Sequence, residues 1–384
     1  MLEADAEVDR RDFTVRAALS VAPGERLALF GPSGAGKTTI LEMIAGLVPP
    51  RRALILLRGR VLTSTDRPVA VIPPWRRRVG LLRQDPGLFP HLSVRANLLY
   101  GRAGSDPGAE TELAELAGVL GIDGLLDSMP ARLSGGQAHR AALGRLLLSH
   151  CDALLLDEPY TGLDASLRRT LTDLVVSLVA QRGVPSILVA HELAEAQAFA
   201  DRLAVLDRGQ VLQAGAPGEV VLAPASRRVA ELVGYTSFVP APADRAAPPG
   251  PPAPGLTAAR VSRDPADSGS SDGRQPAGRP VAAIHPDRVI CGGHPERGLV
   301  LAGRVTSCRP AGALWEITIM AGETPVTGRL SEPAATGQDL VLTAVDPPVF
   351  VSGTRSGGEY GDPADNVAGP GSAGAWSGRT GVRR

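Results

Sequence analysis

Lysine is almost absent from this sequence. Lys37 is the single lysine among 40 basic residues, and the other 39 are arginine. Whatever favours arginine elsewhere does not apply at position 37, where a compact ammonium fits and a planar guanidinium does not. The 40 basic residues balance 40 acidic ones, so the formal net charge is +0. No overall field therefore favours nucleic acid or an anionic surface as a partner.

Cysteine and long apolar runs are scarce as well. The three cysteines, Cys151, Cys291 and Cys308, are an odd number without metal-ligand spacing, which fits a reducing cytosol and not a disulfide framework. No apolar run reaches the roughly 18 residues that a membrane-spanning helix needs, and the N-terminus has no signal-peptide pattern. No G-x-G-x-x-G motif follows a predicted strand, which argues against dinucleotide binding. We therefore expect a cytoplasmic protein that does not bind dinucleotides.

Apolar strands that alternate with helices indicate an α/β fold with a mainly parallel sheet. A length of 384 residues predicts two domains, and 43% hydrophobic residues suffice for a full core. Ligands of such sheets bind at the carboxyl ends of the strands. The pattern predicts two short strands within 1–30, a hairpin within 53–72, strands at 79–82, 153–156 and 186–190, and helices at 94–100, 111–127, 138–148 and 165–181.

The strongest motif lies at residues 31–39, which fit the P-loop pattern G-x-x-x-x-G-K-[ST] between an apolar strand and a helix. Glycines let backbone N–H groups turn inward as an anion nest, and the helix N-terminus adds a positive partial charge. Lys37 can reach the β- and γ-phosphates, and the Thr38 hydroxyl can ligate Mg²⁺. The predicted nucleotide-binding loop is Gly31, Pro32, Ser33, Gly34, Ala35, Gly36, Lys37, Thr38 and Thr39.

Polar residues follow three further predicted strands. Asp157 can hold Mg²⁺ through water, and Glu158 can polarise a water as general base. Two adjacent carboxylates after an apolar run are costly unless they serve a cation. His191 can donate a hydrogen bond to a γ-phosphate, and Gln84 can face Mg²⁺ or the attacking water. We predict Glu158, His191 and Gln84 as catalytic residues, and Thr38, Gln84 and Asp157 as magnesium ligands.

Two other features each allow two interpretations. Residues 134–137 open a predicted helix and form either an anion-binding helix end or a capping turn. Phe13 lies upstream of the P-loop, and it either stacks on an adenine ring or belongs to a strand core. The residues alone leave both alternatives open.

The order and spacing of these motifs resemble those of ABC-transporter ATPases throughout residues 10–235. The resemblance implies a P-loop core with an antiparallel β-subdomain and a helical subdomain over roughly 88–150. It also implies ATP and Mg²⁺ as cofactors and a head-to-tail dimer with a second copy, in which one P-loop and the partner's signature sandwich ATP. In that dimer His191 would clamp the γ-phosphate, Gln84 would sense the permease, and Asp164 would cross the interface. The residues that match the family's signature are Leu133, Ser134, Gly135, Gly136 and Gln137.

Other stretches are similar to a subset of importers. Residues 88–101 look like the importers for small anions and metals, and residues 72–80 and 144–147 look most like molybdate importer ATPases. The resemblance implies a separate membrane permease, an extracytoplasmic substrate-binding protein and a peripheral location at the cytoplasmic face of the membrane. Molybdate is the favoured cargo, and sulfate or thiosulfate, ferric iron and polyamine are the alternatives.

The composition of the chain changes after the ATPase motifs. We predict an ABC ATPase domain at 1–236, a linker rich in Pro, Ala and Gly at 237–280, a small β-barrel domain at 281–351 and a disordered tail at 352–384. Residues 283–289 look like the accessory TOBE-like domain of such importers, which senses substrate or supports dimerisation. The predicted barrel strands are 281–284, 299–307, 313–319, 340–345 and 349–351.

Other classes of P-loop protein fit the motifs less well. A P-loop kinase or nucleotidase lacks the signature, and non-transport ABC ATPases usually carry coiled coils, zinc modules or paired cassettes, none of which is visible. The C-terminal strands make an exporter subunit less compatible. The sequence therefore predicts an importer ATPase that catalyses in-line attack of water on the γ-phosphoryl group.

Overall fold

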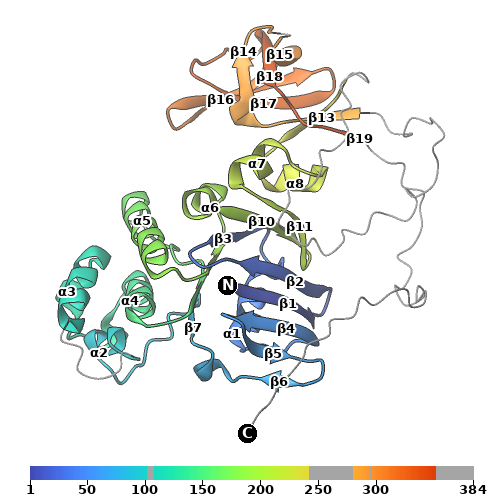
Figure 1. Ribbon diagram of the computed structural model, residues 1–384. Coiled ribbons are helices and arrows are strands. Elements are labelled where there is room, and N and C mark those ends of the chain that lie inside the picture. The colour runs from blue at the N-terminus through green and yellow to red at the C-terminus, as the bar shows by residue number, and fades with distance from the viewer. Residues whose placement is uncertain (102–107, 242–279, 295, 352–384) are drawn as a thin grey trace, which may run out of the picture.

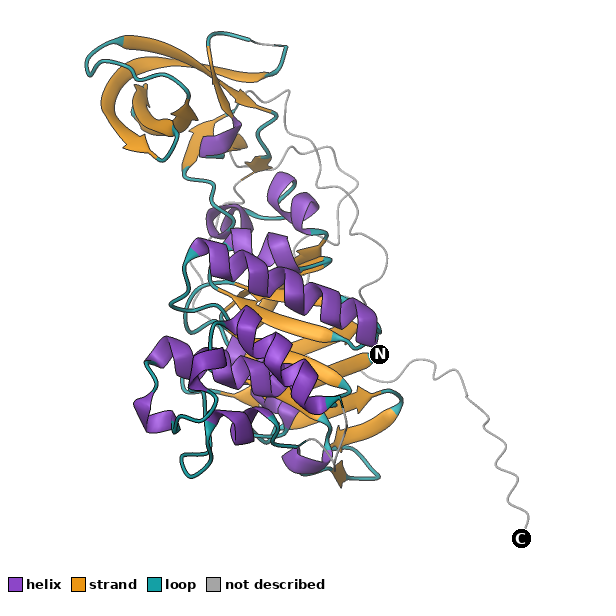
Figure 2. Ribbon diagram, turned by 90° about the vertical axis from the view of Figure 1, so that its left-hand side faces the viewer, coloured by secondary structure: helices purple, strands orange, loops and turns teal. Residues whose placement is uncertain are grey.

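The computed structural model describes residues 1–101, 108–241, 280–294 and 296–351. Figure 1 shows an α/β region that is built on two sheets, with a group of helices at one side and a separate β domain at one end. In Figure 2, the helices cover one face of the strands. The predicted P-loop core, antiparallel β-subdomain and helical subdomain are all confirmed.

The first sheet is antiparallel and has the strand order β2-β1-β4-β5-β6. Its strands alternate buried apolar and exposed polar residues, as in β1, because only one face meets the core. This pattern gives every strand a fixed register against its neighbours. The strands are β1 (Leu2–Asp9), β2 (Thr14–Val21), β4 (Arg52–Leu57), β5 (Arg60–Ser64) and β6 (Ala70–Val71).

The second sheet has the order β11-β10-β3-β9-β8-β7, and every neighbouring pair is parallel except β10 with β11. Its central strands are buried on both faces and are continuously apolar, as parallel strands covered by helices must be. The strands are β3 (Arg26–Phe30), β7 (Val79–Leu82), β8 (Ala153–Asp157), β9 (Ser186–Ala190), β10 (Arg202–Asp207) and β11 (Gln210–Gly215).

Helix α1 (Lys37–Ala45) is buried between the two sheets. Its apolar residues Ile40, Leu41 and Ile44 are at most 1% exposed and join side chains of both sheets in one core. The helix therefore begins at the carboxyl end of β3 and is held on both sides, which fixes the position of the loop before it.

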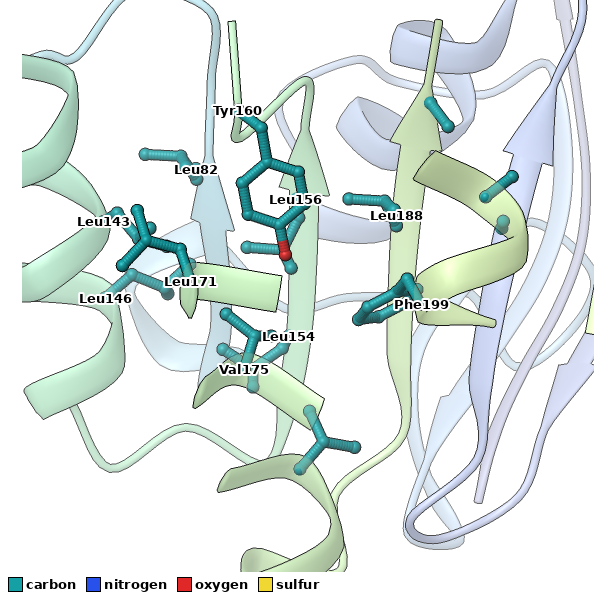
Figure 3. Packing of buried hydrophobic residues seen from close by; sticks show 14 of the residues in the cluster. Leu82, Leu143, Leu146, Leu154, Leu156, Tyr160, Leu171, Val175, Leu188 and Phe199 are labelled. Carbon is teal, nitrogen blue, oxygen red and sulfur yellow. The ribbon is translucent and has the colours of Figure 1, made fainter. Parts of the chain in front are cut away.

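A second core lies on the opposite face of the parallel sheet. Figure 3 shows Leu82 from β7 and Leu156 from β8 packed with Leu143 and Leu171 of two helices, and with Tyr160. This core joins the sheet to the helical side of the molecule. The helices are α2 (Val94–Leu98), α3 (Ala109–Leu120), α4 (Gly135–Leu148), α5 (Ala165–Arg182), α6 (Leu193–Phe199), α7 (Pro217–Leu222) and α8 (Arg227–Leu232).

The C-terminal β domain consists of a three-stranded sheet, β12-β13-β19, and a five-stranded sheet, β14-β18-β15-β16-β17. A shared core, which includes Ile284, Ile317 and Leu342, holds the two sheets together. The strands are β12 (Ser237–Pro240), β13 (Pro280–Ile284), β14 (Val289–Cys291), β15 (Gly298–Ala311), β16 (Leu314–Ala321), β17 (Thr324–Leu330), β18 (Asp339–Val345) and β19 (Val349–Val351).

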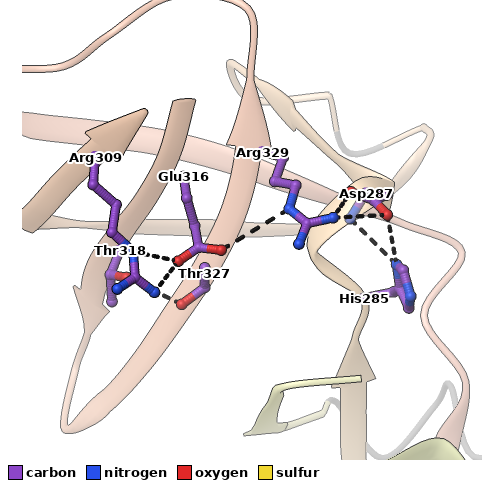
Figure 4. A network of polar contacts seen from close by, with 7 residues as sticks. All are labelled: His285, Asp287, Arg309, Glu316, Thr318, Thr327 and Arg329. Carbon is purple, nitrogen blue, oxygen red and sulfur yellow. Dashed lines mark hydrogen bonds and ion pairs between the residues drawn. The ribbon is translucent and has the colours of Figure 1, made fainter. Parts of the chain in front are cut away.

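A chain of charged side chains crosses the larger C-terminal sheet, as Figure 4 shows. Arg309 Nε donates to Glu316 at 2.7 Å, and Arg329 donates to Asp287 at 3.0 Å. The backbone N–H of Asp287 in turn donates to Nδ1 of His285 at 3.2 Å. His285 also packs edge-on against Tyr235, which follows α8, so the β domain contacts the α/β region through this imidazole.

Four details of the predicted elements were wrong. Residues 1–30 form three strands instead of two, and the helix predicted at 111–127 ends at Leu120 because Gly121 takes a left-handed φ of 61°. Residues 237–240, predicted as the start of a linker, form β12 and pair with β13. Strands β10, β11, β14 and β17 were missed. The rest of the predicted linker up to 279 and the predicted tail, 352–384, lie outside the described residues.

Candidate functional site

The P-loop connects β3 to α1, as predicted. At Gly31 the backbone passes so close to the neighbouring strand that a Cβ would lie 2.1 Å from the carbonyl oxygen of Leu206. Gly36 precedes the helix with a φ of 100°, a conformation that side chains of L-residues rarely adopt. Glycine is therefore required at both ends of the loop, and the N–H groups of the first turn of α1 are left for a ligand.

The ammonium group of Lys37 lies inside this loop. Its Nζ donates hydrogen bonds to the carbonyl oxygens of Gly31 at 2.8 Å and Pro32 at 3.0 Å. Burial lowers the pKa of Lys37, while the nearby carboxylates of Glu158 and Asp157 favour the charged form. The single lysine of the chain thus places its charge near buried acids and within the loop that is predicted to bind phosphate.

Thr38 and Asp157 supply neighbouring oxygen donors. The Thr38 hydroxyl, at the start of α1, donates to Asp157 Oδ1 at the end of β8 across 3.1 Å. Asp157 is only 3% exposed, and burial raises the pKa of its carboxyl group. A hydroxyl and a buried carboxylate fit Mg²⁺, which prefers a few hard oxygen ligands and keeps several waters. The predicted magnesium ligands Thr38 and Asp157 are thus brought together.

Glu158 turns back toward the site at the end of β8. Its φ of 54° lies in the left-handed region, which is strained for a residue with a side chain. Its N–H donates to the carbonyl oxygen of Val189 at 3.2 Å, which anchors the turn to β9. The carboxylate is about one-tenth exposed and contacts Nε2 of His191, at the end of β9. Glu158, the predicted general base, therefore contacts His191, which is predicted to bind the γ-phosphate.

Gln84 follows β7, the strand next to β8, and its side chain is exposed. Within the described ranges no hydrogen bond of the Gln84 amide group is found, so its approach to the magnesium ligands remains a prediction. The P-loop, Asp157-Glu158, His191 and Gln84 nevertheless follow four adjacent strands, β3, β8, β9 and β7. Since these strands are parallel, their carboxyl ends meet at one edge of the sheet.

The signature residues lie on a different element. Ser134 caps α4, accepting from the N–H of Gln137 at 3.3 Å, and the Gln137 side chain accepts from the N–H of Ser134 at 2.8 Å. Ser134 and Gly135 are exposed. Among the described residues, no hydrogen bond or ion pair joins this turn to the P-loop of the same chain. The capping interpretation is confirmed, and anion binding by this turn remains a prediction.

Asp164 caps α5 and accepts from the N–H groups of Leu167 at 3.0 Å and Ser166 at 2.9 Å. The hydrogen bond from Leu167 is the largest reason why the pKa of Asp164 lies below its usual range. The carboxylate is exposed and follows the end of β8 in the chain. Its predicted place at a dimer interface requires a partner copy and stays a prediction.

Phe13 is partly buried and packs against the core between the two sheets. Its backbone carbonyl accepts from the N–H of Arg10 at 2.9 Å, which closes the turn between β1 and β2. The Arg10 side chain then donates to the hydroxyl of Thr39 at 3.0 Å. The core interpretation of Phe13 is confirmed in part, and its contact with adenine remains a prediction.

Sequence reasoning missed three residues near the site. His139 is buried on α4, Arg10 contacts the P-loop helix, and Glu195 is largely buried beside the His191 turn. Burial raises the pKa of Glu195 to about 7 and lowers the pKa of His139. His139 and Glu195 could have been found from the sequence, because each is a titratable residue among apolar residues of a helix. Arg10 has no such signal, because its contact joins a turn to a helix residue 29 positions later in the chain.

A family model and a solved structure are similar to the α/β region of this chain. Residues 15–161 match the family model described as "ABC transporter". A solved structure described as "Structure of ATP binding subunit of ABC transporter" is 28% identical, with a TM-score of 0.51, and the match covers 61% of this chain and 94% of that chain. The α/β region therefore has the P-loop ATPase fold of ABC transporters.

Curated relatives are similar over about the same region. The Fe(3+) ions import ATP-binding protein FbpC of Pseudomonas fluorescens is 42% identical over 228 residues, which are 59% of this chain and 64% of the relative. The sulfate/thiosulfate import ATP-binding protein CysA 2 of Chromobacterium violaceum is 40% identical over 59% of this chain and 60% of the relative. The molybdenum import ATP-binding protein ModC of Mycobacterium tuberculosis is 43% identical over 56% of this chain and 60% of the relative. The chain spans about three-fifths of the length of these relatives, whose names give three different cargoes.

Proposed function

We propose that this protein is the ATP-hydrolysing subunit of an ABC importer. The observation that carries the proposal is the pairing of Thr38 with Asp157 and of Glu158 with His191 at adjacent strand ends, beside the buried ammonium of Lys37. These groups are what hydrolysis of a nucleoside triphosphate needs: a phosphate cradle, oxygen ligands for Mg²⁺ and a general base. Import ATPases at 40–43% identity support the same reading.

The reaction is an in-line attack of water on the γ-phosphoryl group of ATP. The P-loop N–H groups and Lys37 hold the phosphates and compensate their charge. Thr38, Asp157 and Gln84 would hold Mg²⁺, which would neutralise phosphate charge during the reaction. Glu158 accepts the proton of the attacking water, and His191 orients that carboxylate and donates to the γ-phosphate. The strained turn at Glu158 aims the base from a rigid strand end.

Dimerisation would complete the site. Ser134 and Gly135 are exposed at the start of α4, a 14-residue helix whose N-terminus can bind an anion. Because this turn makes no polar contact with its own P-loop among the described residues, we propose that it binds the γ-phosphate held by a second copy. The exposed Asp164 carboxylate would lie at the same head-to-tail interface.

A permease is the second proposed partner. A hollow of 290 Å³ lies between the loop after Gln84 and α4, and its lining includes Gly87, Phe89, Tyr100 and Arg145. Arg145 stacks over Phe89 and donates to the carbonyl oxygen of Gly87 at 3.0 Å, so α4 and the loop form one surface. We propose that the permease docks here and acts on the site through Gln84. No helix within the described ranges is long and apolar enough to cross a membrane.

The cargo is proposed from similarity alone. Molybdate is supported by 43% identity to a molybdenum import protein, and ferric iron by 42% identity to an Fe(3+) import protein. These values are too close to rank the two cargoes, and sulfate or thiosulfate follows at 40%. We propose an oxyanion or metal importer with molybdate as the first cargo to test, polyamine as the last, and the C-terminal β domain as a TOBE-like accessory domain.

Two measurements test the proposal. Purified protein should release phosphate from ATP in the presence of Mg²⁺, and Lys37→Ala should lose this activity; an inactive native protein with intact nucleotide binding would refute the assignment. Uptake of molybdate, tungstate, sulfate, ferric iron and putrescine would then be compared between cells with native protein and cells with Lys37→Ala. Loss of molybdate and tungstate uptake alone supports the proposed cargo. Loss of iron or putrescine uptake keeps the ATPase assignment and replaces the cargo.

A further inference from the structure

His139 is a buried polar residue that the proposed reaction does not use. It lies in the second turn of α4, behind the exposed signature turn, and is only 6% exposed. In the described part of the chain, its Nε2 is buried without a hydrogen-bond partner. A buried nitrogen without a hydrogen bond lowers the stability of the folded protein, so its presence in an otherwise apolar helix face suggests a function.

The surroundings of His139 follow from the packing below it. Leu143 lies one helical turn further along α4, on the same face, and packs in the core that contains Leu82 of β7 and Leu156 of β8 (Figure 3). Leu82 and Leu156 are paired in the parallel ladder, so Gln84 and Glu158, each two residues further on, leave the sheet at the same level. His139 lies at that level, where both loops begin.

The imidazole lies near both loops. Burial lowers its pKa, and the backbones of Pro159 and Gln84 and the charge of Glu158 act in the opposite direction, so all three lie close to the ring. Pro159 directly follows the proposed base, and Gln84 is the proposed sensor of the permease. One side chain of α4 therefore lies beside the turn that carries the base and the loop that carries the sensor.

We propose that His139 is a positioning residue that links the signature helix to the loops of Gln84 and Glu158, so that hydrolysis responds to movements of the helical subdomain. A neutral imidazole suits this place, because its one N–H can donate to a backbone carbonyl, the only polar group that the backbone of Pro159 offers. A movement of α4 then reaches the base through this buried polar side chain and not through apolar packing alone. The proposal rests on the proposed ATPase function.

The test compares His139→Ala and His139→Gln with a matched control, His150→Gln. His150 is exposed just beyond the same helix, away from both loops. We expect His139→Ala to lower kcat for ATP hydrolysis by about 10- to 100-fold, since small displacements of a catalytic group cost about that much. KM for ATP and nucleotide binding should stay within about threefold, because His139 does not touch the P-loop. His139→Gln keeps a donor and an acceptor and should restore kcat to within about threefold of the native value.

The other outcomes contradict the proposal. An unchanged kcat in His139→Ala, with an active native protein, would overturn this inference and leave the ATPase assignment intact. Equal losses in His139→Ala and His139→Gln, with lower melting temperatures in both, would assign His139 to packing only. A native protein that binds ATP without hydrolysing it would refute the ATPase function, and this inference with it.

Discussion

His191 and Glu158 come from neighbouring strands and meet directly: Nε2 of the imidazole contacts the carboxylate. Strands β8 and β9 pair in parallel, so the two side chains leave the sheet at the same edge. The acid is buried and the imidazole is about half exposed, which places the base inside and its partner at the rim. The pair thus lies at the same sheet edge as the P-loop, which is where the proposed reaction requires a general base.

Substitution of the base should separate binding from turnover. We expect Glu158→Gln to bind ATP normally, hydrolyse it at least about 100-fold more slowly and accumulate ATP-bound dimers, because general-base catalysis contributes about 10²–10⁴-fold. Phosphate release and size-exclusion chromatography with ATP measure the two effects. Glu115→Gln, on the exposed side of α3, is the control. Rapid hydrolysis by Glu158→Gln would remove Glu158 from its proposed role.

The single lysine offers a chemical probe of the P-loop. Lys37 is 5% exposed and hydrogen-bonded within the loop, so an amine-reactive acylating reagent should modify it slowly. ATP at about ten times its Kd should slow the modification about tenfold, because only the free fraction reacts. Mass spectrometry of the peptide that contains residue 37 measures the rate, and Lys37→Arg controls for side reactions. A rate that ATP leaves unchanged would contradict nucleotide binding at this loop.

Arg10 should contribute to nucleotide affinity. Its guanidinium donates to Thr39 at 3.0 Å and lies 3.9 Å from Glu42, which ties the turn of Phe13 to the P-loop helix. We expect Arg10→Ala to raise KM for ATP about 3- to 10-fold with kcat nearly unchanged, which corresponds to one hydrogen bond of about 1 kcal/mol. Arg11→Ala is the control, since Arg11 makes no ion pair in the ranges that the structure describes. Equal effects of the two variants would show that general charge, and not the Thr39 contact, matters.

Arg77 should stabilise the folded protein. This guanidinium is 3% exposed and donates to the carbonyl oxygens of Ile44 at 2.9 Å and Ile72 at 2.8 Å, and to the Thr63 hydroxyl at 2.7 Å. Arg77→Ala leaves these acceptors without a donor, so we expect the free energy of unfolding to fall by about 2–4 kcal/mol. Urea denaturation measures the change, and the exposed Arg76→Ala serves as control. A loss below about 0.5 kcal/mol would show that water replaces the guanidinium.

Glu195 should make stability depend on pH near neutrality. Burial raises the pKa of Glu195 to about 7 from 4.5, so its contribution is fully present below pH 4.5 and is lost as the pH rises through about 7. The charges that act on it are those of Arg168 and Glu192, and the backbone of His191 favours the charged form. We expect Glu195→Gln to be more stable than the native protein at pH 8, by on the order of 1–3 kcal/mol.

The control for Glu195→Gln is the same comparison of the two proteins at low pH. At pH 4 the carboxyl group is mostly protonated in both the folded and the unfolded protein, so Glu195→Gln and the native protein should unfold at nearly the same urea concentration. An equal difference between the two proteins at pH 4 and pH 8 would show that the amide changes packing and that the carboxyl group does not titrate in this range.

The sequence allowed most of the site to be predicted, because its chemistry is local. The P-loop, Asp157-Glu158 and His191 each follow an apolar strand, and parallel topology then brings them together. Residues that act through long-range packing were not predictable in this way. His139 looks like any helix residue until Leu82 and Leu156 are known to be paired beneath it. Strand β14 was missed because it has only three residues and pairs with β18, far along the chain. Strand β17 was missed because Pro325 and Gly328 lower its strand propensity.

Strand β12 has a practical consequence for dividing this protein. The chain completes β12 at Pro240 and returns only at Pro280 to form β13, so the smaller sheet is assembled from two separate stretches. A fragment that starts at residue 280 lacks β12, so it would expose the free edge of β13. The accessory domain is therefore not an interchangeable module. An expression fragment or a domain graft must carry residues 237–240 with it, or it will present an open strand to other molecules.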